Sequence, residues 1–170
     1  MRPWRDRLPG GTIESGQEST AQAYLVGDLL EMDSQVASTS GFRLRIALRS
    51  ASTITSTSLI GVAAEPASSV TDATRIYWPI NPQTEFCART RGSTITSSNI
   101  GQAYGLFKDS TKNVCGVDLA NQVSTSLRVV ITRLIDAAGD SGGYVGFKFG
   151  TPAGTASTNT FGGGANPLRY

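Results

Sequence analysis

Apolar and polar residues alternate along short stretches of this chain, and between Leu59 and Asp118 these stretches are closed by Gly, Pro, Asn or Asp. From Phe42 to Arg49 the apolar Phe42, Leu44, Ile46 and Leu48 alternate with Arg43, Arg45, Ala47 and Arg49. This period of two predicts a half-buried β-strand. Similar runs predict further strands at about 59–64, 75–80, 85–91, 102–108, 113–119, 127–135 and 143–149.

Two regions of the chain predict more than the presence of a strand. Between 127 and 135 apolar residues occupy both alternating sets, which predicts a central strand buried on both faces. Residues 23–32 predict a strand with a kink or bulge at Gly27. We also expect Trp78 and Ile80 to contribute to the core, with Pro79 confining its strand to a sheet edge or a strand end.

The overall pattern predicts an all-β fold, a compact antiparallel barrel or sandwich with extended N- and C-terminal arms. Many short strands at roughly ten-residue spacing are typical of these architectures. No segment longer than ten residues has a convincing helical period with caps, although 116–122 is compatible with one helical turn. We see no internal repeat in the sequence.

The chain divides by composition into an N-terminal arm at 1–20, a β domain at 21–150 and a Gly/Thr-rich C-terminal arm at 151–170. Neither arm has enough apolar residues to fold alone. Each nevertheless carries isolated large apolar side chains, which we interpret as anchors that become buried against a neighbour. These are Trp4, Leu8 and Ile13 in the first arm and Phe161, Leu168 and Tyr170 in the second.

Charge argues against several partners. The net charge of +2 is too small for the concentrated basic patch that binding to nucleic acid requires. No apolar run approaches the roughly 20 residues of a membrane span. The N-terminus lacks the apolar region of a secretory signal, so we expect synthesis in the cytoplasm.

The basic side of the 42–49 strand allows two interpretations. Arg43, Arg45 and Arg49 form a ribbon that is either a solvated face or an edge that pairs with acidic groups on another protein. Solvated charged faces are common on strands. Guanidinium groups also match carboxylates in a bidentate geometry. The sequence alone leaves both interpretations open.

One motif resembles enzyme chemistry. Residues 139–143 read GDSGG, the peptide around the nucleophilic serine of chymotrypsin-like proteases. That serine needs a histidine as general base, and this chain has no histidine. A hairpin turn between the strands at 127–135 and 143–149 explains the motif better. The acidic residues are scattered and form no recognisable catalytic pair, so we expect a protein that is not an enzyme.

Cys87 and Cys115 both fall within predicted strands. The simplest interpretation is that each is a small buried apolar residue. A disulfide between neighbouring strands stays open, although cytoplasmic synthesis argues against it. Two isolated thiols without a histidine do not make a zinc site. We therefore expect neither a metal nor a cofactor.

Five segments, taken in order, carry a resemblance to a known family. They read AYLVGDLLEMDS, LIGVAAEPASS, IYWPINPQTEFCART, IGQAYGLFKDSTKNVCGVDL and LRVVITRLIDAAGDSGGYVGFKF, and they span about three-quarters of the chain. In order and spacing they resemble the capsid decoration, or cement, proteins of tailed bacteriophages. The two arms lie outside the resemblance.

The resemblance implies a structural virion protein on the exterior of the capsid. Such proteins are small β domains that commonly assemble as homotrimers, bind the major capsid protein and clamp neighbouring capsid subunits. The candidate contacts are then the six arm anchors and the three arginines. Two alternatives remain: a receptor- or carbohydrate-binding module, in which Tyr24, Tyr77, Trp78 and Tyr104 stack on sugars, and a tail or baseplate subunit.

Overall fold

The computed structural model describes residues 2–3, 13–19, 22–32, 43–46, 59–80, 84–109, 114–122 and 129–150, and of 2–3 and 43–46 it describes the backbone alone. Within these residues the fold is all-β, and the helical structure is a single 3-10 turn at Ser97–Asn99. The strands are β1 Arg2–Pro3, β2 Glu14–Glu18, β3 Leu29–Met32, β4 Arg43–Ile46, β5 Leu59–Ala63, β6 Thr74–Pro79, β7 Phe86–Arg91, β8 Ala103–Asp109, β9 Val114–Gln122, β10 Val129–Leu134 and β11 Tyr144–Phe149.

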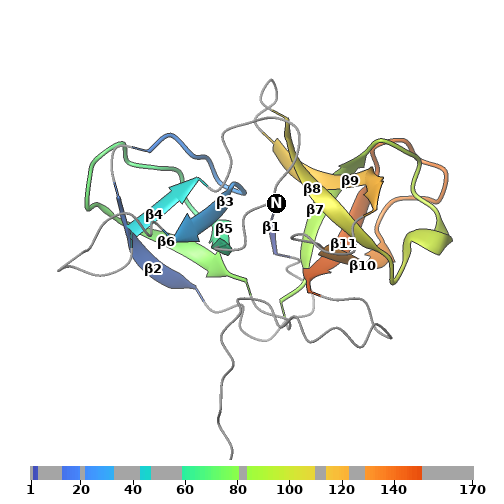
Figure 1. The fold of residues 1–170 in the computed structure, drawn as a ribbon, viewed down its shortest axis with the longest axis horizontal. Coiled ribbons are helices and arrows are strands. Elements are labelled where there is room, and N and C mark those ends of the chain that lie inside the picture. Colours follow the sequence, from blue (N-terminus) through green and yellow to red (C-terminus); the bar gives the residue numbers. More distant parts are fainter. Residues whose placement is uncertain are drawn as a thin grey trace, which may run out of the picture.

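The first half of the chain forms a closed barrel, which we call the N-terminal barrel. Its strands follow one another in the order β2-β4-β3-β5-β6, and β6 pairs back onto β2. The pairing of β2 with β4 is parallel, and the other four pairings are antiparallel. Figure 1 shows this barrel on the left.

The second half forms a curled sheet in the order β1-β7-β11-β10-β8-β9. The sheet curls until β9 pairs in parallel with β7, so that β7, β11, β10, β8 and β9 make a second ring, which we call the C-terminal barrel. Strand β1 lies outside this ring and pairs with β7. Gly116 permits this closure, because a Cβ there would lie 2.4 Å from the carbonyl oxygen of Arg89 on β7. Any larger residue would push the two strands apart.

The two barrels have the same topology. When the strands of each ring are numbered one to five along the chain, strand one pairs in parallel with strand three in both rings. The antiparallel pairs are also the same, namely one with five, two with three, two with four, and four with five. The register agrees as well. Glu14 opposite Tyr77 corresponds to Phe86 opposite Phe147, and Glu18 opposite Leu44 corresponds to Thr90 opposite Val117. The fold therefore contains an internal repeat that the sequence does not reveal.

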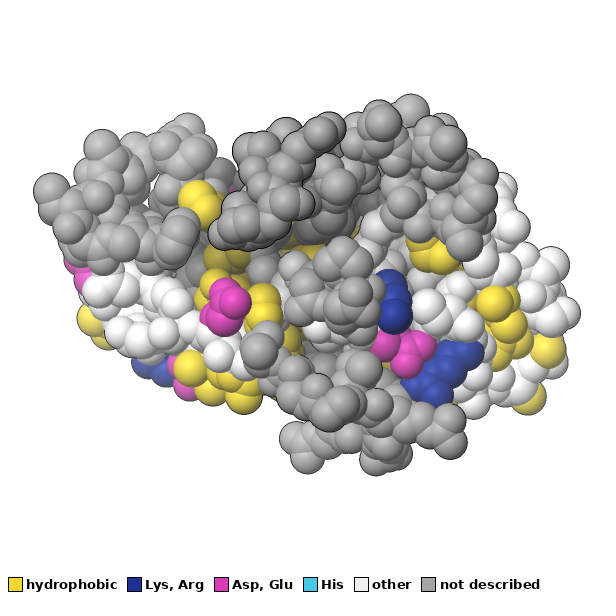
Figure 2. Space-filling view, turned by 90° about the horizontal axis from the view of Figure 1, so that it is seen from below, with side chains coloured by type: hydrophobic (Ala, Val, Ile, Leu, Met, Phe, Trp, Pro, Cys, Tyr) yellow, Lys and Arg dark blue, Asp and Glu magenta, His cyan; other side chains and the backbone are white. Residues whose placement is uncertain are grey.

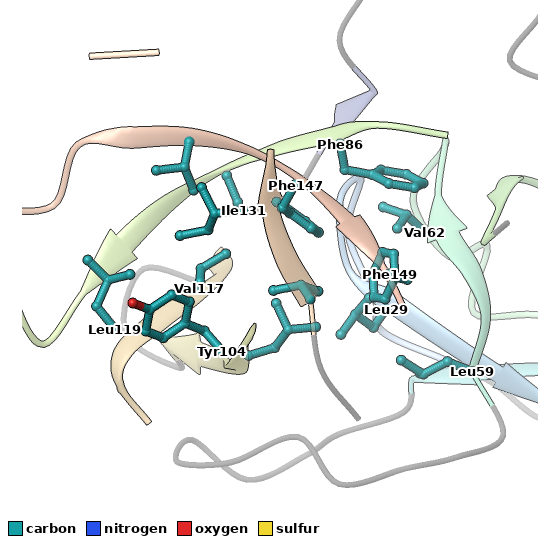
Figure 3. Close-up of a cluster of buried hydrophobic side chains, with 14 of the residues drawn as sticks. Leu29, Leu59, Val62, Phe86, Tyr104, Val117, Leu119, Ile131, Phe147 and Phe149 are labelled. Atoms are coloured by element: carbon teal, nitrogen blue, oxygen red, sulfur yellow. The ribbon is translucent and has the colours of Figure 1, made fainter. Parts of the chain in front are cut away.

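A single large apolar cluster fills the C-terminal barrel and extends into the junction with the N-terminal one. Leu29 and Val62, on neighbouring strands of the N-terminal barrel, belong to the same buried cluster as Phe86, Phe147 and Phe149 (Figure 3). The adjacent residues Leu30 and Ala63 point the other way, into a smaller cluster with Tyr24 and Tyr77. Strand alternation thus lets β3 and β5 pack against both interiors.

A buried ion pair also crosses the junction. The ammonium of Lys108 on β8 lies 2.9 Å from Asp28 Oδ2, just before β3, and Asp28 is 2% exposed. The same carboxylate accepts a hydrogen bond from the Leu25 amide, and the Cys115 thiol lies 3.6 Å from its other oxygen. These contacts tie the two barrels together through the almost fully buried carboxylate of Asp28.

The all-β prediction is confirmed, and strands form at each of the seven stretches expected between residues 59 and 149. The sequence predicted one barrel or sandwich, whereas the described strands form two rings. The expected strand at 23–32 starts only at Leu29, because residues 25–28 form a turn in which Gly27 has a φ of 92°. The compatible helical turn at 116–122 is instead part of β9.

The boundary of the N-terminal arm at residue 20 is wrong. Residues 14–18 are β2, a strand of the closed barrel, and Arg2–Pro3 pairs with β7. Strand β2 was missed because its sequence, ESGQE, has no apolar residue. Residues 151–170, the expected second arm, lie outside the described residues. Trp78 and Ile80 pack against the larger cluster but stay partly exposed, and Pro79 ends β6 as predicted.

Candidate contact surface

Most of the predicted contact residues fall outside what the structure describes, namely Trp4, Leu8, Arg49, Phe161, Leu168 and Tyr170. Arg43 and Arg45 lie on β4, where their backbones pair with Gln17 and Glu31, and their side chains are outside the description. Ile13 immediately precedes β2 and is 58% exposed. Ile13 is therefore the one predicted anchor whose surroundings can be analysed.

Ile13 begins an exposed sheet surface made by β2 and β6. Ile13 and Ser15 lie on the side of β2 opposite the buried Glu18, and both are exposed. On the neighbouring strand Ile76 stands opposite Ser15 and is 38% exposed. Two isoleucine side chains thus reach solvent from adjacent strands of one sheet.

This surface continues toward the junction. Trp78 lies two residues beyond Ile76 on the same side of β6 and packs against the larger apolar cluster. We call Ile13, Ile76 and Trp78 the apolar outer face. Figure 2, which views the molecule from below, shows hydrophobic side chains reaching from the N-terminal barrel toward the middle. Sequence reasoning missed Ile76, because Ile76, Tyr77 and Trp78 are all apolar and their run does not say which residue faces out.

The corresponding surface of the C-terminal barrel is charged. Arg133 forms an ion pair with Glu85 at 3.1 Å, and both side chains pass over Gly146, where a Cβ would lie within 2.9 Å of each of them. Thr132 also donates a hydrogen bond to Glu85. Beside this pair the Arg89 guanidinium lies over the Tyr144 ring, 5.7 Å from its centre. Equivalent faces of the two barrels therefore offer different chemistry to a partner.

The GDSGG segment forms part of the connection between β10 and β11, as predicted. Gly139 and Gly142 adopt positive φ angles of 102° and 73°, which favour glycine. Ser141 is exposed and forms an isolated bridge with Thr94. The segment is anchored by backbone bonds between Ile95 and residues 139 and 140, at 2.8 and 3.0 Å. Its role is that of a turn.

The carboxylates of the described strands are engaged in structural contacts. Glu18 accepts hydrogen bonds from the amide and hydroxyl of Ser68, and Asp118 receives two from Arg91. Among the described residues no group of three or more Cys, Asp or Glu side chains could hold a metal ion.

Both cysteines are buried and free. Burial, together with the negative charge of Asp28, raises the pKa of the Cys115 thiol to about 11. This thiol is therefore protonated at neutral pH and is a poor nucleophile. The expectation of small buried residues is confirmed for Cys87 and Cys115.

The aromatic residues considered for sugar stacking are mostly inside the protein. Tyr24, Tyr77 and Tyr104 are 1%, 7% and 5% exposed. Burial and the charge of Glu18 raise the pKa of Tyr24, and burial with a hydrogen bond to Glu14 raises that of Tyr77 to about 12. A sugar approaching from solvent would reach only Trp78 of this set.

No protein-family model, curated protein or solved structure matches the chain. Within the described part of the chain, no helix is long and apolar enough to cross a membrane.

Proposed function

We propose that this chain is a structural virion protein that binds the outer surface of a tailed-phage capsid and stabilises contacts between major capsid subunits. We further propose that it acts as a homotrimer. The order of the five segments that resemble decoration proteins supports this proposal. The structure adds a surface suited to binding.

The observation that carries the proposal is the apolar outer face. Ile13, just before β2, and Ile76, on the adjacent strand β6, are 58% and 38% exposed, and Trp78 on β6 is partly exposed. Single exposed apolar residues are ordinary, whereas a group on one sheet surface is typical of a contact site. The apolar cluster and the Lys108–Asp28 ion pair at the junction connect this surface to the C-terminal barrel, which carries the charged face.

The expected affinity per copy is modest. Burying one isoleucine fully is worth about 1.5–3 kcal/mol, and part of that gain is offset by the entropy of association. Three linked copies on a lattice bind far more tightly, because the second and third contacts form at high effective concentration. A small apolar face on each subunit is therefore sufficient for stable attachment.

Cosedimentation with purified, expanded heads tests the proposal. We expect the full-length protein to sediment with heads and the double variant Ile13→Ser, Ile76→Ser to do so at least about tenfold more weakly. Val114→Ser is the matched control, because Val114 is 39% exposed on the C-terminal barrel and lies outside the apolar outer face. Full occupancy of heads by the double variant would exclude this face as the attachment surface.

Immunogold labelling of intact particles separates the proposal from the alternatives. Label on the head supports a decoration protein, and label confined to the tail or baseplate contradicts it. Binding to an immobilised glycan that depends on Trp78 would favour the carbohydrate-binding alternative.

A further inference from the structure

Strand β7 of the C-terminal barrel has one edge shared by two partners. Its last two residues, Thr90 and Arg91, pair with β9, while its first two, Phe86 and Cys87, pair with β1 from the N-terminus of the chain. The β1 pairing is antiparallel. A short extended segment thus completes the part of the edge that β9 leaves uncovered.

The N-terminal barrel has the same edge on β2. There β4 covers Gln17 and Glu18, and the residues that correspond to Phe86 and Cys87 are Glu14 and Ser15. Among the described residues no strand pairs with Glu14 and Ser15 on this side. In the C-terminal barrel β1 covers this stretch of the edge, and in the N-terminal barrel no described strand covers the corresponding stretch.

The residues on the covered edge of β7 are less exposed than those on the corresponding edge of β2. Cys87, which pairs with Arg2 of β1, is 3% exposed, and its neighbour Phe86 is buried in the apolar cluster. Glu14 and Ser15 are both exposed, as is Ile13 beside them. An exposed strand edge presents backbone N–H and C=O groups to any extended peptide that reaches it.

We propose that the β2 edge at Ile13–Gly16 is a strand-addition site, filled by the C-terminal segment 151–170 of a second copy of this chain. In the C-terminal barrel the occupant is Arg2–Pro3, a segment outside the ring of five strands, and residues 151–170 likewise follow the last strand of that ring, β11. At about 3.3 Å per residue, the segment is long enough to cross between neighbouring molecules. It includes Thr155, Thr158, Thr160 and Phe161, residue types that favour strands.

The direction of the strand favours a second copy over the same chain. Glu14 pairs with Tyr77, so Ile13 lies at the Trp78 end of the sheet, near the junction that contains Phe149. A segment that leaves Phe149 and follows the β2 edge in its own molecule would run parallel to β2. An antiparallel strand, as β1 is on β7, begins beside Gly16, next to β4, and runs toward Ile13, so a tail that approaches from outside the molecule supplies it more directly than the chain's own tail.

Disulfide trapping between full-length chains tests this proposal in solution, without capsids. One chain carries Ser15→Cys and the other carries Thr158→Cys, and the mixture is oxidised mildly at a series of protein concentrations. In the control mixture Val114→Cys replaces Ser15→Cys, since Val114 is also exposed at a strand end. Cys87 and Cys115 are buried and remain in both chains.

We expect the Ser15 mixture to form the mixed disulfide at least about tenfold faster than the control, because strand addition raises the effective concentration of the two thiols. Equal rates in the two mixtures would overturn the proposal. A further variant carries both Ser15→Cys and Thr158→Cys in one chain. If this variant forms only the disulfide within the chain, at a rate independent of protein concentration, the proposal is overturned and the chain's own tail fills the edge. Neither outcome depends on head binding, so this test and the cosedimentation test can fail separately.

Discussion

Where the N-terminal barrel places Tyr77 opposite Glu14, the C-terminal barrel places Phe147 opposite Phe86. In the first pair the Tyr77 hydroxyl donates a hydrogen bond to the Glu14 carboxylate at 2.8 Å. In the second pair the two rings stack with centroids 6.1 Å apart, and Phe149 packs edge-on against both. One strand topology therefore tolerates a polar and an apolar interior.

The difference extends beyond this pair. Arg75 and Glu18 of the N-terminal barrel correspond in register to Val145 and Thr90 of the C-terminal barrel. The N-terminal barrel therefore buries fewer apolar groups in its own interior, and its Leu29 and Val62 pack into the cluster of its neighbour. We infer that the C-terminal barrel is the stable part of the molecule and that the N-terminal barrel depends on it.

The largest effect should come from removing β2. A chain that starts at Ala21 lacks Glu14–Glu18, which pairs with both β4 and β6, so we expect the N-terminal barrel to open. Limited proteolysis should then cut within residues 22–80 while 84–150 persists. A chain that starts at Ile13 is the control, because it loses β1 but keeps β2. Equal protease resistance of the two shortened chains would contradict the assignment of β2 to the barrel.

Phe147→Ala should destabilise the C-terminal barrel by about 3–5 kcal/mol. Phe147 is fully buried and touches both other rings of the aromatic cluster, so its removal leaves a cavity. Denaturant unfolding measures the effect. Because Leu29 and Val62 share this cluster, we expect the N-terminal barrel to be destabilised as well. Independent unfolding of an unaffected N-terminal barrel would break the inferred dependence.

Tyr77→Phe, at the corresponding position, should cost only about 1 kcal/mol, the net worth of one hydrogen bond. The substitution should also change the response to alkali. An unfolded tyrosine ionises at its ordinary pKa of 10.0, whereas the pKa of Tyr77 in the folded protein is raised to about 12. The stability that Tyr77 contributes is therefore complete below pH 10 and is lost as the pH rises through 12. Between these pH values, the free energy of unfolding from denaturant titrations should fall less steeply with pH in the variant than in the native chain.

Ser141→Ala should have the smallest effect, within about 0.5 kcal/mol, because Ser141 is an exposed turn residue. No hydrolytic activity should appear or disappear. Labelling of Ser141 by a fluorophosphonate probe would contradict the assignment of GDSGG as a turn.

Much of the strand content could be predicted from sequence. Alternation located strands near Leu59–Ala63, Thr74–Pro79 and every strand from β7 to β11, since half-buried strands need one apolar face. It failed at β2, whose sequence ESGQE has no apolar residue and whose buried positions are Gly16 and Glu18. Among the candidate contacts, Ile13 was predicted as an anchor, but its neighbour Ile76 was hidden within an apolar run.

The sequence by itself determined an all-β chain with turns at its glycines and with two cysteines inside strands, and the structure showed that these cysteines are free. The pairing of strands was decided only in the tertiary structure, because contacts between residues such as Glu18 and Leu44 depend on the closure of the ring and leave no local pattern. The internal repeat escaped detection for the same reason. Corresponding positions share backbone hydrogen bonds, which every residue type can accept and every type except proline can donate, so the side chains Glu14 and Phe86 could diverge while the register stayed the same.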